Sequence, residues 1–517
     1  MSDRHSHLHR GLEATLDPDF QARFGRLFPH APAARFGADE PEEHANLAKL
    51  AAAMTSGFDE PKDGADTEES GVPALYTYFG QFIDHDLTFD PTASFQKIKD
   101  PDAVTDYRSA AFDLDNVYGR GPGDQPYMYA DDGRTFLLGD PLTMGGAVGF
   151  SAHDLQRNGA GRALIGDPRN DENVIVSQLQ GLFHRFHNRV AAERPQAPFA
   201  ELQTIMRRHY QYVVINDFLP RLVAPEVLDA LKTGGRYDAA KLQFFKPSVL
   251  PFMPVEFSVA AYRFGHSMVR PGYRLNDATL LPIFPIPVDE KPGFPEGLTG
   301  FRRMIGDWAI DWGRFIDIDE RSYGTVVPPF PAPTDLRGQV HNFQRLQLAY
   351  RIDTALVDPL GRLPETVAGN RPFGLAHRNL LRGVQFKLPS GQTVAEAMGV
   401  SPPLRDDQIL IGQGLDTPDG QKPITDISSS FAGKCPLWTY VLAEAMYHRS
   451  PTTTPTKEHH VVNTLQLGPV GGRIVAEVFV GLMLSDPFSL LSADPDWKPC
   501  DLADYGLKDF VRYALGL

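Results

Sequence analysis

Apolar residues recur along the chain mainly at spacings of three and four positions, which is the period of a helix with one buried face. The clearest example covers 174–192, where the apolar positions are Leu179, Leu182, Phe183, Phe186 and Val190. Seven more segments fit a helix: 74–87, 199–218, 255–269, 303–312, 373–382, 436–447 and 470–484. Strict alternation of apolar and polar residues over four or more positions is scarce, which leaves little material for a large sheet. We therefore predict a mainly α-helical fold with little β-structure.

Domain organisation follows from the length of the chain and from what joins the helices. A chain of 517 residues would allow about three domains by length alone. However, no internal repeat and no low-complexity linker divides it into parts. The 46 glycines and 44 prolines indicate long, ordered loops between the helices. We expect an N-terminal arm at residues 1–60 and one large helical domain at 61–517.

The composition excludes several classes of protein. Two cysteines, Cys435 and Cys500, cannot build a disulfide framework or a cysteine-rich metal module, and we expect both to be buried thiols. A net charge of -15 without a basic block argues against nucleic-acid binding as the main function. No apolar run is long enough for a transmembrane segment, and the first residues lack the apolar core of a secretory signal. We expect a cytoplasmic protein, or one exported without a recognisable N-terminal signal.

The segment FGQFIDHD at 79–86 gathers polar side chains in an apolar frame. On a helix, Gln81 lies one turn before His85 and Asp84 lies beside it, so an amide, a carboxylate and an imidazole converge on one face. Buried polar groups need partners, and a ligand in a cavity would supply them. The competing interpretation is a helix cap or a histidine whose ring is satisfied within the core.

A second group of oxygen-bearing side chains begins with Asp86 and continues in the segment SAAFDLD at 109–115. There Ser109, Asp113 and Asp115 are spaced so that one extended loop can turn them toward a single point. Ca²⁺ takes about six to eight hard oxygen ligands in such sites. The segment therefore indicates a calcium site, with a solvated acidic turn as the alternative.

Two histidines, His184 and His187, form an HxxH pair on the helix predicted at 174–192. No glutamate accompanies them as it does in zinc proteases. We therefore expect both rings to serve packing rather than metal binding.

The segments GQFIDHD and DLDNVYG resemble motifs of the animal-type haem peroxidases, within the peroxidase-cyclooxygenase superfamily. Further matches follow in the expected order: RNDE at 169–172, HNRVA at 187–191, AYRFGH at 261–266 and NLLRG at 379–383. They span roughly 75–385, and the likeness continues to the C-terminal helices. The resemblance, to a bacterial-type member, implies a single helical domain that encloses haem b between a distal and a proximal helix.

The resemblance assigns His85 as the distal histidine. A neutral imidazole suits the transfer of a proton from one oxygen of H2O2 to the other near pH 7. Arg169 matches the guanidinium that stabilises charge on the departing oxygen. Gln81 would hydrogen-bond a distal water or a bound halide.

On the proximal side, the resemblance assigns His266 as the ligand of the haem iron. Asn379 would accept a hydrogen bond from its ring N–H and fix its tautomer. Arg263 and Arg382 match residues that partner the haem propionates.

Two carboxylates, Asp84 and Glu172, match those that are ester-linked to haem methyl groups in mammalian members, so covalent attachment is an open alternative to free haem b. The residue after Glu172 is Asn173, where a methionine would be needed for a sulfonium link, and we expect that link to be absent.

The calcium ligands that the resemblance implies agree with those indicated by the oxygen-rich loop. They are Asp86, Ser109, Ala111 through its carbonyl, Asp113 and Asp115. Ser109 and Asp115 replace a usual Thr and Ser, and both substitutions keep an oxygen ligand.

The function favoured by these residues is a haem peroxidase that uses H2O2 to oxidise a small electron donor, either halide or thiocyanate or a phenolic or aromatic compound. A fatty-acid dioxygenase of the same superfamily is the first alternative. Its radical tyrosine stands three residues before the proximal histidine, where this chain has Arg263, and Tyr262 lies one position further away. The second alternative is a non-enzymatic haem- or calcium-binding protein.

Overall fold

The computed structural model describes residues 24–58, 67–88, 109–142, 152–246, 251–276, 278–286, 296–318, 346–369, 371–412, 420–454, 461–499 and 504–517. Every residue proposed above for the site lies within these ranges. Cys435 is buried, as predicted, whereas Cys500 lies outside them.

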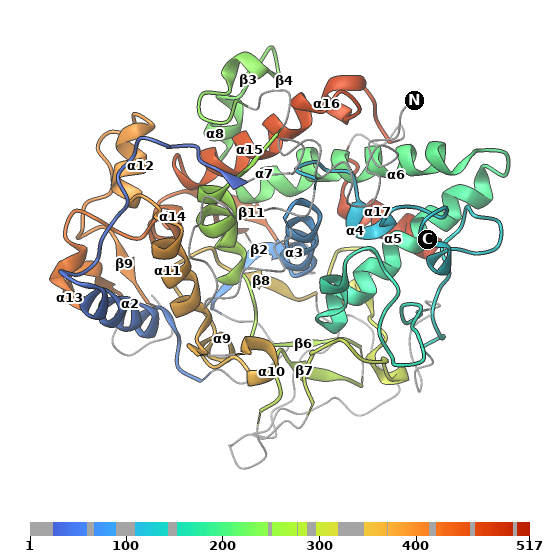
Figure 1. The fold of residues 1–517 in the computed structure, drawn as a ribbon, viewed down its shortest axis with the longest axis horizontal. Helices are drawn as coiled ribbons and strands as arrows, with labels where there is room; N and C mark the ends of the chain where they lie inside the picture. The colour runs from blue at the N-terminus through green and yellow to red at the C-terminus, as the bar shows by residue number, and fades with distance from the viewer. Residues whose placement is uncertain are drawn as a thin grey trace.

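Helices form most of the regular structure (Figure 1). The α-helices are α2 (Glu40–Met54), α3 (Leu75–Leu87), α4 (Asp115–Tyr118), α5 (Val174–Glu193), α6 (Phe199–Val213), α7 (Leu219–Leu222), α8 (Pro225–Asp229), α9 (Asp358–Gly361), α10 (Glu365–Ala368), α11 (Leu375–Gln385), α12 (Gly391–Ala397), α13 (Ile424–Ile427), α14 (Leu437–Ala445), α15 (Gly471–Ser485), α16 (Leu490–Ala493) and α17 (Leu507–Leu515).

The strands are short and pair two by two. The pairs are β1 (Phe24–Gly25) with β5 (Met253–Pro254), β2 (Glu69–Pro73) with β8 (Leu348–Tyr350), β3 (Lys232–Thr233) with β4 (Arg236–Tyr237), β6 (Gly272–Arg274) with β7 (Leu280–Pro282), β9 (Leu410–Ile411) with β10 (Lys422–Pro423), and β11 (Arg449–Thr453) with β12 (Val461–Leu465). The first pair is parallel and the others are antiparallel. The predicted mainly α fold with little β-structure is confirmed.

Helices α14 and α15 lie in the core because their sequences are apolar on nearly every face. All residues of α14 are buried, and so are those of α15 from Ile474 to Met483. Both helices pack against the segment Ala261–His266. This segment is therefore packed against two buried apolar helices as well as against α3.

Helix α3 lies near the centre of the view in Figure 1 and is buried over most of its length. It packs against α5 and against Ala261–His266. Phe79 makes an edge contact with Phe218, and Phe82 stacks on Phe183. Among the α3 residues after Phe79, only Gly80, Gln81 and Asp84 are half-buried.

Six of the eight predicted helices are found close to their predicted bounds, as α3, α5, α6, α11, α14 and α15. The prediction for 199–218 is met by α6 followed by a π-helical stretch, Val214–Phe218. The helix predicted at 255–269 is irregular. It consists of a π-helical stretch, Glu256–Ala260, and a 3-10 stretch, Ala261–His266, with non-helical dihedral angles at Ala260 (φ -128, ψ -75).

The prediction of a helix at 303–312 is wrong. This segment has one 3-10 turn at Gly306–Trp308, and another turn begins at Trp312. Its backbone groups bond to other parts of the chain: the amide of Asn276 donates to the carbonyls of Asp307 and Ala309, and Gln178 bonds to Trp308 and Ile310. These tertiary bonds replace the bonds that a helix would have made.

Among the helices of the described ranges, none combines the length and the apolar character that a membrane crossing requires.

Candidate functional site

A cavity of about 810 Å³ lies between α3 and the segment Ala261–His266. Gln81, Asp84 and His85 of α3 line it, and so do Arg263 and His266. Most other lining side chains are apolar or aromatic, among them Phe218, Phe264, Met268, Ile283, Phe284, Leu298, Leu360, Leu363 and Leu375. A mainly apolar cavity of this size with a few convergent polar groups is typical of a cofactor site.

The imidazole of His85 is fixed from two sides. Its Nδ1 lies 2.7 Å from Oδ1 of Asn170, and its Nε2 lies 3.6 Å from Oε1 of Glu172. His85 is buried at the cavity wall. The α3 residues predicted to share a face are therefore brought to one cavity, with Nε2 directed toward Glu172.

Glu172 lies at the C-terminal side of the 3-10 turn Pro168–Asp171, directly before α5. Its Oε1 accepts a hydrogen bond from the amide of Gln81, and Asn173 donates to Oε1 of Gln81 over 3.2 Å. Burial raises the pKa of Glu172 to about 7, against the opposing effect of Arg169. Burial also raises the pKa of Asp84. The site thus holds two carboxyl groups that are easier to protonate than ordinary ones.

Arg169 differs from its predicted placement. Its guanidinium donates to the carboxylate of Asp167 over 2.8 Å and to the backbone carbonyls of His85 and Thr88. Arg169 is absent from the described residues that line the cavity. Three competing acceptors therefore hold the side chain at the C-terminal end of α3. Its charge still opposes the rise in the pKa of Glu172.

His266 and Asn379 are in contact, but through other atoms than predicted. Nδ2 of Asn379, and not the expected amide oxygen, lies 2.9 Å from Nδ1 of His266. The reason is Arg263, whose guanidinium donates to Oδ1 of Asn379 over 2.9 Å. Burial lowers the pKa of His266 to about 3, so its ring is neutral near pH 7.

Arg382 does not reach the cavity in this structure. Its guanidinium lies over the ring of Phe386, 5.0 Å from the ring centroid. It is absent from the described lining residues, whereas Arg263 is among them.

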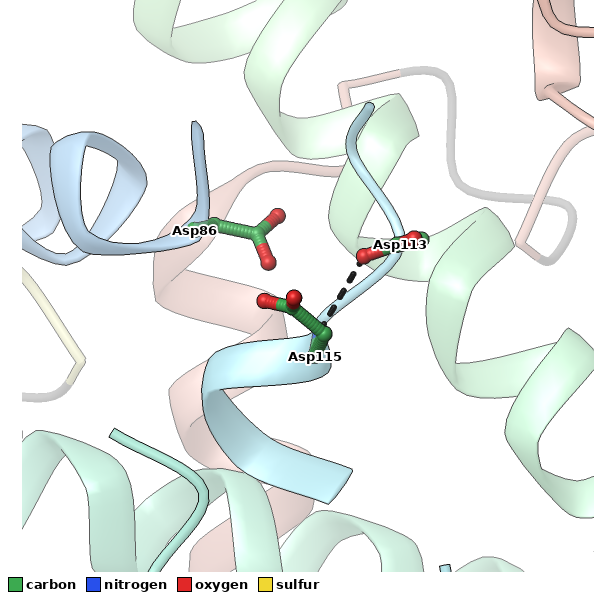
Figure 2. Close-up of side chains that lie close together, drawn as sticks. All are labelled: Asp86, Asp113 and Asp115. Atoms are coloured by element: carbon green, nitrogen blue, oxygen red, sulfur yellow. Dashed lines mark hydrogen bonds between the residues drawn. The ribbon is translucent and has the colours of Figure 1, made fainter. Parts of the chain in front are cut away.

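The predicted calcium ligands gather near the C-terminal end of α3, and none of them is among the residues that line the cavity. Asp86, Asp113 and Asp115 are buried, and one carboxylate oxygen from each lies within 4.8 Å of the others. Figure 2 shows the carboxylate of Asp86, from the end of α3, facing that of Asp115 at the start of α4. Ser109 donates to Asp113 over 2.7 Å, and Ala111 is buried within the same loop. Three buried carboxyl side chains this close together offer the hard oxygen ligands that Ca²⁺ takes, so this donor set fits Ca²⁺.

Sequence reasoning missed Asn170 and Gln180, which connect His85 to His184 through buried hydrogen bonds. Both His184 and His187 are buried, as the packing interpretation requires. The available signal was the position of Asn170 inside the RNDE motif, but the motif itself marks only the arginine and the glutamate.

Comparison with known sequences gives a consistent family. The sequence model of the animal haem peroxidases matches residues 103–290, a range that includes Arg169 and His266 and begins after His85. A peroxidase-like protein of Margaritifera margaritifera is 35% identical over 115 residues, which is 20% of this chain and 14% of that protein. Human thyroid peroxidase is 27% identical over 162 residues, which is 30% of this chain and 16% of that protein. The aligned segments thus span a small part of these relatives.

Solved structures share the fold over nearly the whole chain. Peroxidase A from Dictyostelium discoideum superposes with a TM-score of 0.60 at 14% identity, covering 96% of this chain and 93% of that one. A fatty acid alpha-dioxygenase from Oryza sativa superposes with a TM-score of 0.56 at 15% identity, covering 95% and 81%. One fold thus serves both a peroxidase and a dioxygenase.

Proposed function

The chain belongs to the animal-type haem peroxidase superfamily, and on this premise we propose that it is a haem-dependent peroxidase that uses H2O2 to oxidise a small electron donor. The observation that carries the proposal is the pairing of His85 and His266 in one cavity of about 810 Å³. A protein that merely stored haem would have no need of an acid-base group on the distal side.

The residues present fit haem b. A neutral His266 is a suitable iron ligand, and the apolar walls suit a flat macrocycle. Arg263 would bind a propionate, with Arg382 as the second candidate. Ligation through Nε2 needs a proton on Nδ1 of His266, so Oδ1 of Asn379 must turn toward that nitrogen. Arg263 then loses its acceptor on Asn379 and becomes available to a propionate.

Asp84 and Glu172 are the carboxyl groups available for ester bonds to the haem, since both line the cavity. Asn173 lines it as well and cannot form a sulfonium link. We therefore propose haem b with attachment, where it occurs, through these two carboxyl groups.

Haem iron, when bound, supplies the centre at which peroxide is reduced. His85 performs the acid-base work: Nε2 accepts a proton from one oxygen of H2O2 and returns it to the departing oxygen. Gln81 holds Glu172 beside this nitrogen. Arg169, at the C-terminal end of α3, stabilises the negative charge that develops on the departing oxygen. A change of its rotamer would bring the guanidinium closer to that oxygen.

A calcium ion at Asp86, Asp113 and Asp115 is part of the proposal. Asp86 directly follows His85, so an ion shared with the 109–115 loop would fix the end of α3. Ser109 and the carbonyl of Ala111 would complete the set of oxygen ligands. The role of this ion is structural, because none of these residues lines the cavity.

The second candidate function is a fatty-acid dioxygenase, which the rice structure favours at the level of the fold. Tyr262 lines the cavity, but its hydroxyl donates to the carbonyl of Gly80 over 3.1 Å. The position that the radical tyrosine would need is Arg263. Peroxidase is therefore the preferred function.

A side-by-side assay tests the proposal. Haem-loaded protein is given guaiacol, iodide or thiocyanate with H2O2, and separately linoleate with O2, followed by product analysis. We expect turnover of at least one donor with H2O2 and no oxygenated lipid. Oxygenated lipid without donor turnover would establish the dioxygenase instead, and no turnover of either kind would favour a non-enzymatic protein.

A further inference from the structure

His85 is the first of four buried side chains that lead away from the cavity through hydrogen bonds. Its Nδ1 lies 2.7 Å from Oδ1 of Asn170. Nδ2 of Asn170 donates to Oε1 of Gln180 over 2.8 Å, and Nε2 of Gln180 lies 2.9 Å from Nε2 of His184. None of the four residues is more than 4% exposed. These bonds are therefore shielded from solvent.

The two amide side chains give this series of bonds a direction. An amide nitrogen donates and an amide oxygen accepts. Gln180 donates to His184, so Nε2 of a neutral His184 ring carries no proton. At the other end, Oδ1 of Asn170 can only accept, so the proton of a neutral His85 ring lies on Nδ1. Nε2 of His85, on the cavity side, then keeps its lone pair.

The far end of the series is held firmly. Burial lowers the pKa of His184 to about 3, so the ring remains neutral. It stacks on Phe136 with ring centroids 4.2 Å apart and an interplanar angle of 9°. Asn188 bonds to the backbone N–H and carbonyl of Phe136, at 2.7 and 2.9 Å. His184 is thus a fixed acceptor.

The middle of the series is held by local structure. Asn170 sits in the 3-10 turn Pro168–Asp171, and its backbone N–H bonds to the carbonyl of Asp167 over 3.1 Å. Gln180 and His184 lie one turn apart on α5, whose start is capped by the side chain of Asn173. The spacing between Asn170 and Gln180 is therefore fixed by the backbone.

We propose that Asn170, Gln180 and His184 are positioning residues that keep His85 in the tautomer with an unprotonated Nε2 facing the cavity. The inference rests on the proposed function, because a peroxide substrate is what gives that nitrogen a proton to accept. The tautomer with the proton on Nε2 cannot act as the base. Breaking the series frees the Asn170 amide to rotate, and both tautomers then become populated.

The direct test is ¹⁵N NMR of histidine-labelled full-length protein, measured on the purified chain and on its diamagnetic ferrous carbon monoxide form where haem is bound. His85→Gln and His184→Gln variants assign the resonances. We expect the rings of both His85 and His184 to show a protonated Nδ1 and an unprotonated Nε2. Protonated Nε2 atoms on both rings, or a mixture at His85, would overturn the proposal.

A matched pair of variants extends the test to reactivity. Gln180→Met breaks the series, whereas Gln178→Met removes another buried glutamine of α5, one that bonds to the backbone at Trp308 and Ile310. We expect Gln180→Met to give mixed tautomers at His85 and to slow the reaction with H2O2 roughly tenfold, with KM for the donor unchanged. Gln178→Met should keep both the tautomer and the rate.

The outcomes separate the positioning of His85 by the hydrogen-bonded series from the proposed peroxidase function. The expected tautomers in a protein that does not reduce H2O2 would support the positioning series and contradict the peroxidase. Active peroxidase with the reversed tautomers would contradict the series alone. Equal losses of rate in the two glutamine variants, with the tautomer of His85 unchanged, would reduce Gln180 to a structural residue and overturn its assignment.

Discussion

The buried and half-buried carboxyl groups of this chain differ in their surroundings, and the surroundings decide what each can do. Glu172 is held by an amide in the cavity, and its pKa is raised to about 7. Asp86 lies close to two other acidic side chains, those of Asp113 and Asp115. Glu444 accepts hydrogen bonds from the backbone N–H groups of Val470 and Gly471 at the start of α15. The same chemical group thus occurs at the wall of the cavity, in an acidic cluster and at the start of a helix.

Glu444 should make stability depend on pH. Burial raises its pKa from 4.5 to about 7, so the folded chain binds this proton more tightly than the unfolded chain does. Its contribution to stability is full below pH about 4.5 and is lost as the pH rises through about 7. Between pH 5 and pH 8, we expect the free energy of unfolding to fall by about 2–3 kcal/mol more in the wild type than in Glu444→Gln, measured by urea denaturation.

Parallel pH profiles for the two proteins in that experiment would mean that Glu444 keeps an ordinary pKa in the fold. Comparing the wild type with one variant cancels the titration of all other groups.

Short motifs located His85, Glu172 and His266, because chemistry fixes the residue type at those positions. The same motifs did not identify Asn170 and Gln180, because the partners of these residues depend on how distant segments meet. The orientation of side chains could not be predicted from the sequence either. Arg169 and Asn379 are turned by the acceptors and donors nearby, and such competition exists only in the folded chain.

Among the elements, helices with a regular apolar period were predicted well, since period and burial are linked directly. The segments at 255–269 and 303–312 were not, because their backbone groups bond outside the segment. In the first of these segments, Trp438 donates to the backbone carbonyl of Arg263 over 3.1 Å, and the backbone N–H of Tyr350 donates to the carbonyl of Met268 over 3.0 Å. The spacing of apolar residues along the sequence cannot predict such tertiary contacts.

Gly300 lines the cavity, and its backbone contacts the loop that carries Glu172. Its N–H donates to the carbonyl of Glu172 over 2.9 Å, and a Cβ there would lie 1.9 Å from the carbonyl oxygen of Asp171. Gly300→Ala should push this loop away from Glu172. We expect a loss of about 1–3 kcal/mol in unfolding free energy, together with weaker haem retention in a dialysis assay.

Gly181→Ala is the matched control, because it lies within α5 and an added Cβ would meet no atom within 4 Å. This variant should be as stable as the wild type or gain up to about 1 kcal/mol. Equal stability of both alanine variants would contradict the close approach at Gly300.

At the scale of the whole molecule, α3 joins the cavity to the acidic cluster. His85 and Asp86 are neighbours in the chain but serve different sites. Asn116 of α4 donates to the carbonyl of Phe82, and Arg207 of α6 donates to that of Asp113. An ion in the cluster would therefore stabilise contacts among three helices rather than one loop.

Calcium should raise the thermal stability of the whole domain. Binding to the folded state alone adds about 2.7 kcal/mol when the ion is at 100 times its Kd, which we expect to raise the Tm by several degrees in differential scanning calorimetry. Mg²⁺ should have a smaller effect because it prefers a rigid octahedral site.

Asp115→Asn should weaken the effect of calcium on the Tm. A control, Asp426→Asn at an exposed position of α13, should leave it intact. A Tm that does not change when Ca²⁺ is added would exclude the calcium site.

The central claim is that His85 performs acid-base chemistry on peroxide opposite an iron held by His266. The most direct measurement is the rate of the Soret change after haem-loaded protein is mixed with H2O2 in a stopped-flow instrument, compared among the wild type, His85→Ala and His448→Ala, a half-buried histidine that is absent from the described cavity lining. We predict a loss of about 10²- to 10⁴-fold in His85→Ala with the haem retained, and no change in His448→Ala. An unchanged rate in His85→Ala would contradict the account.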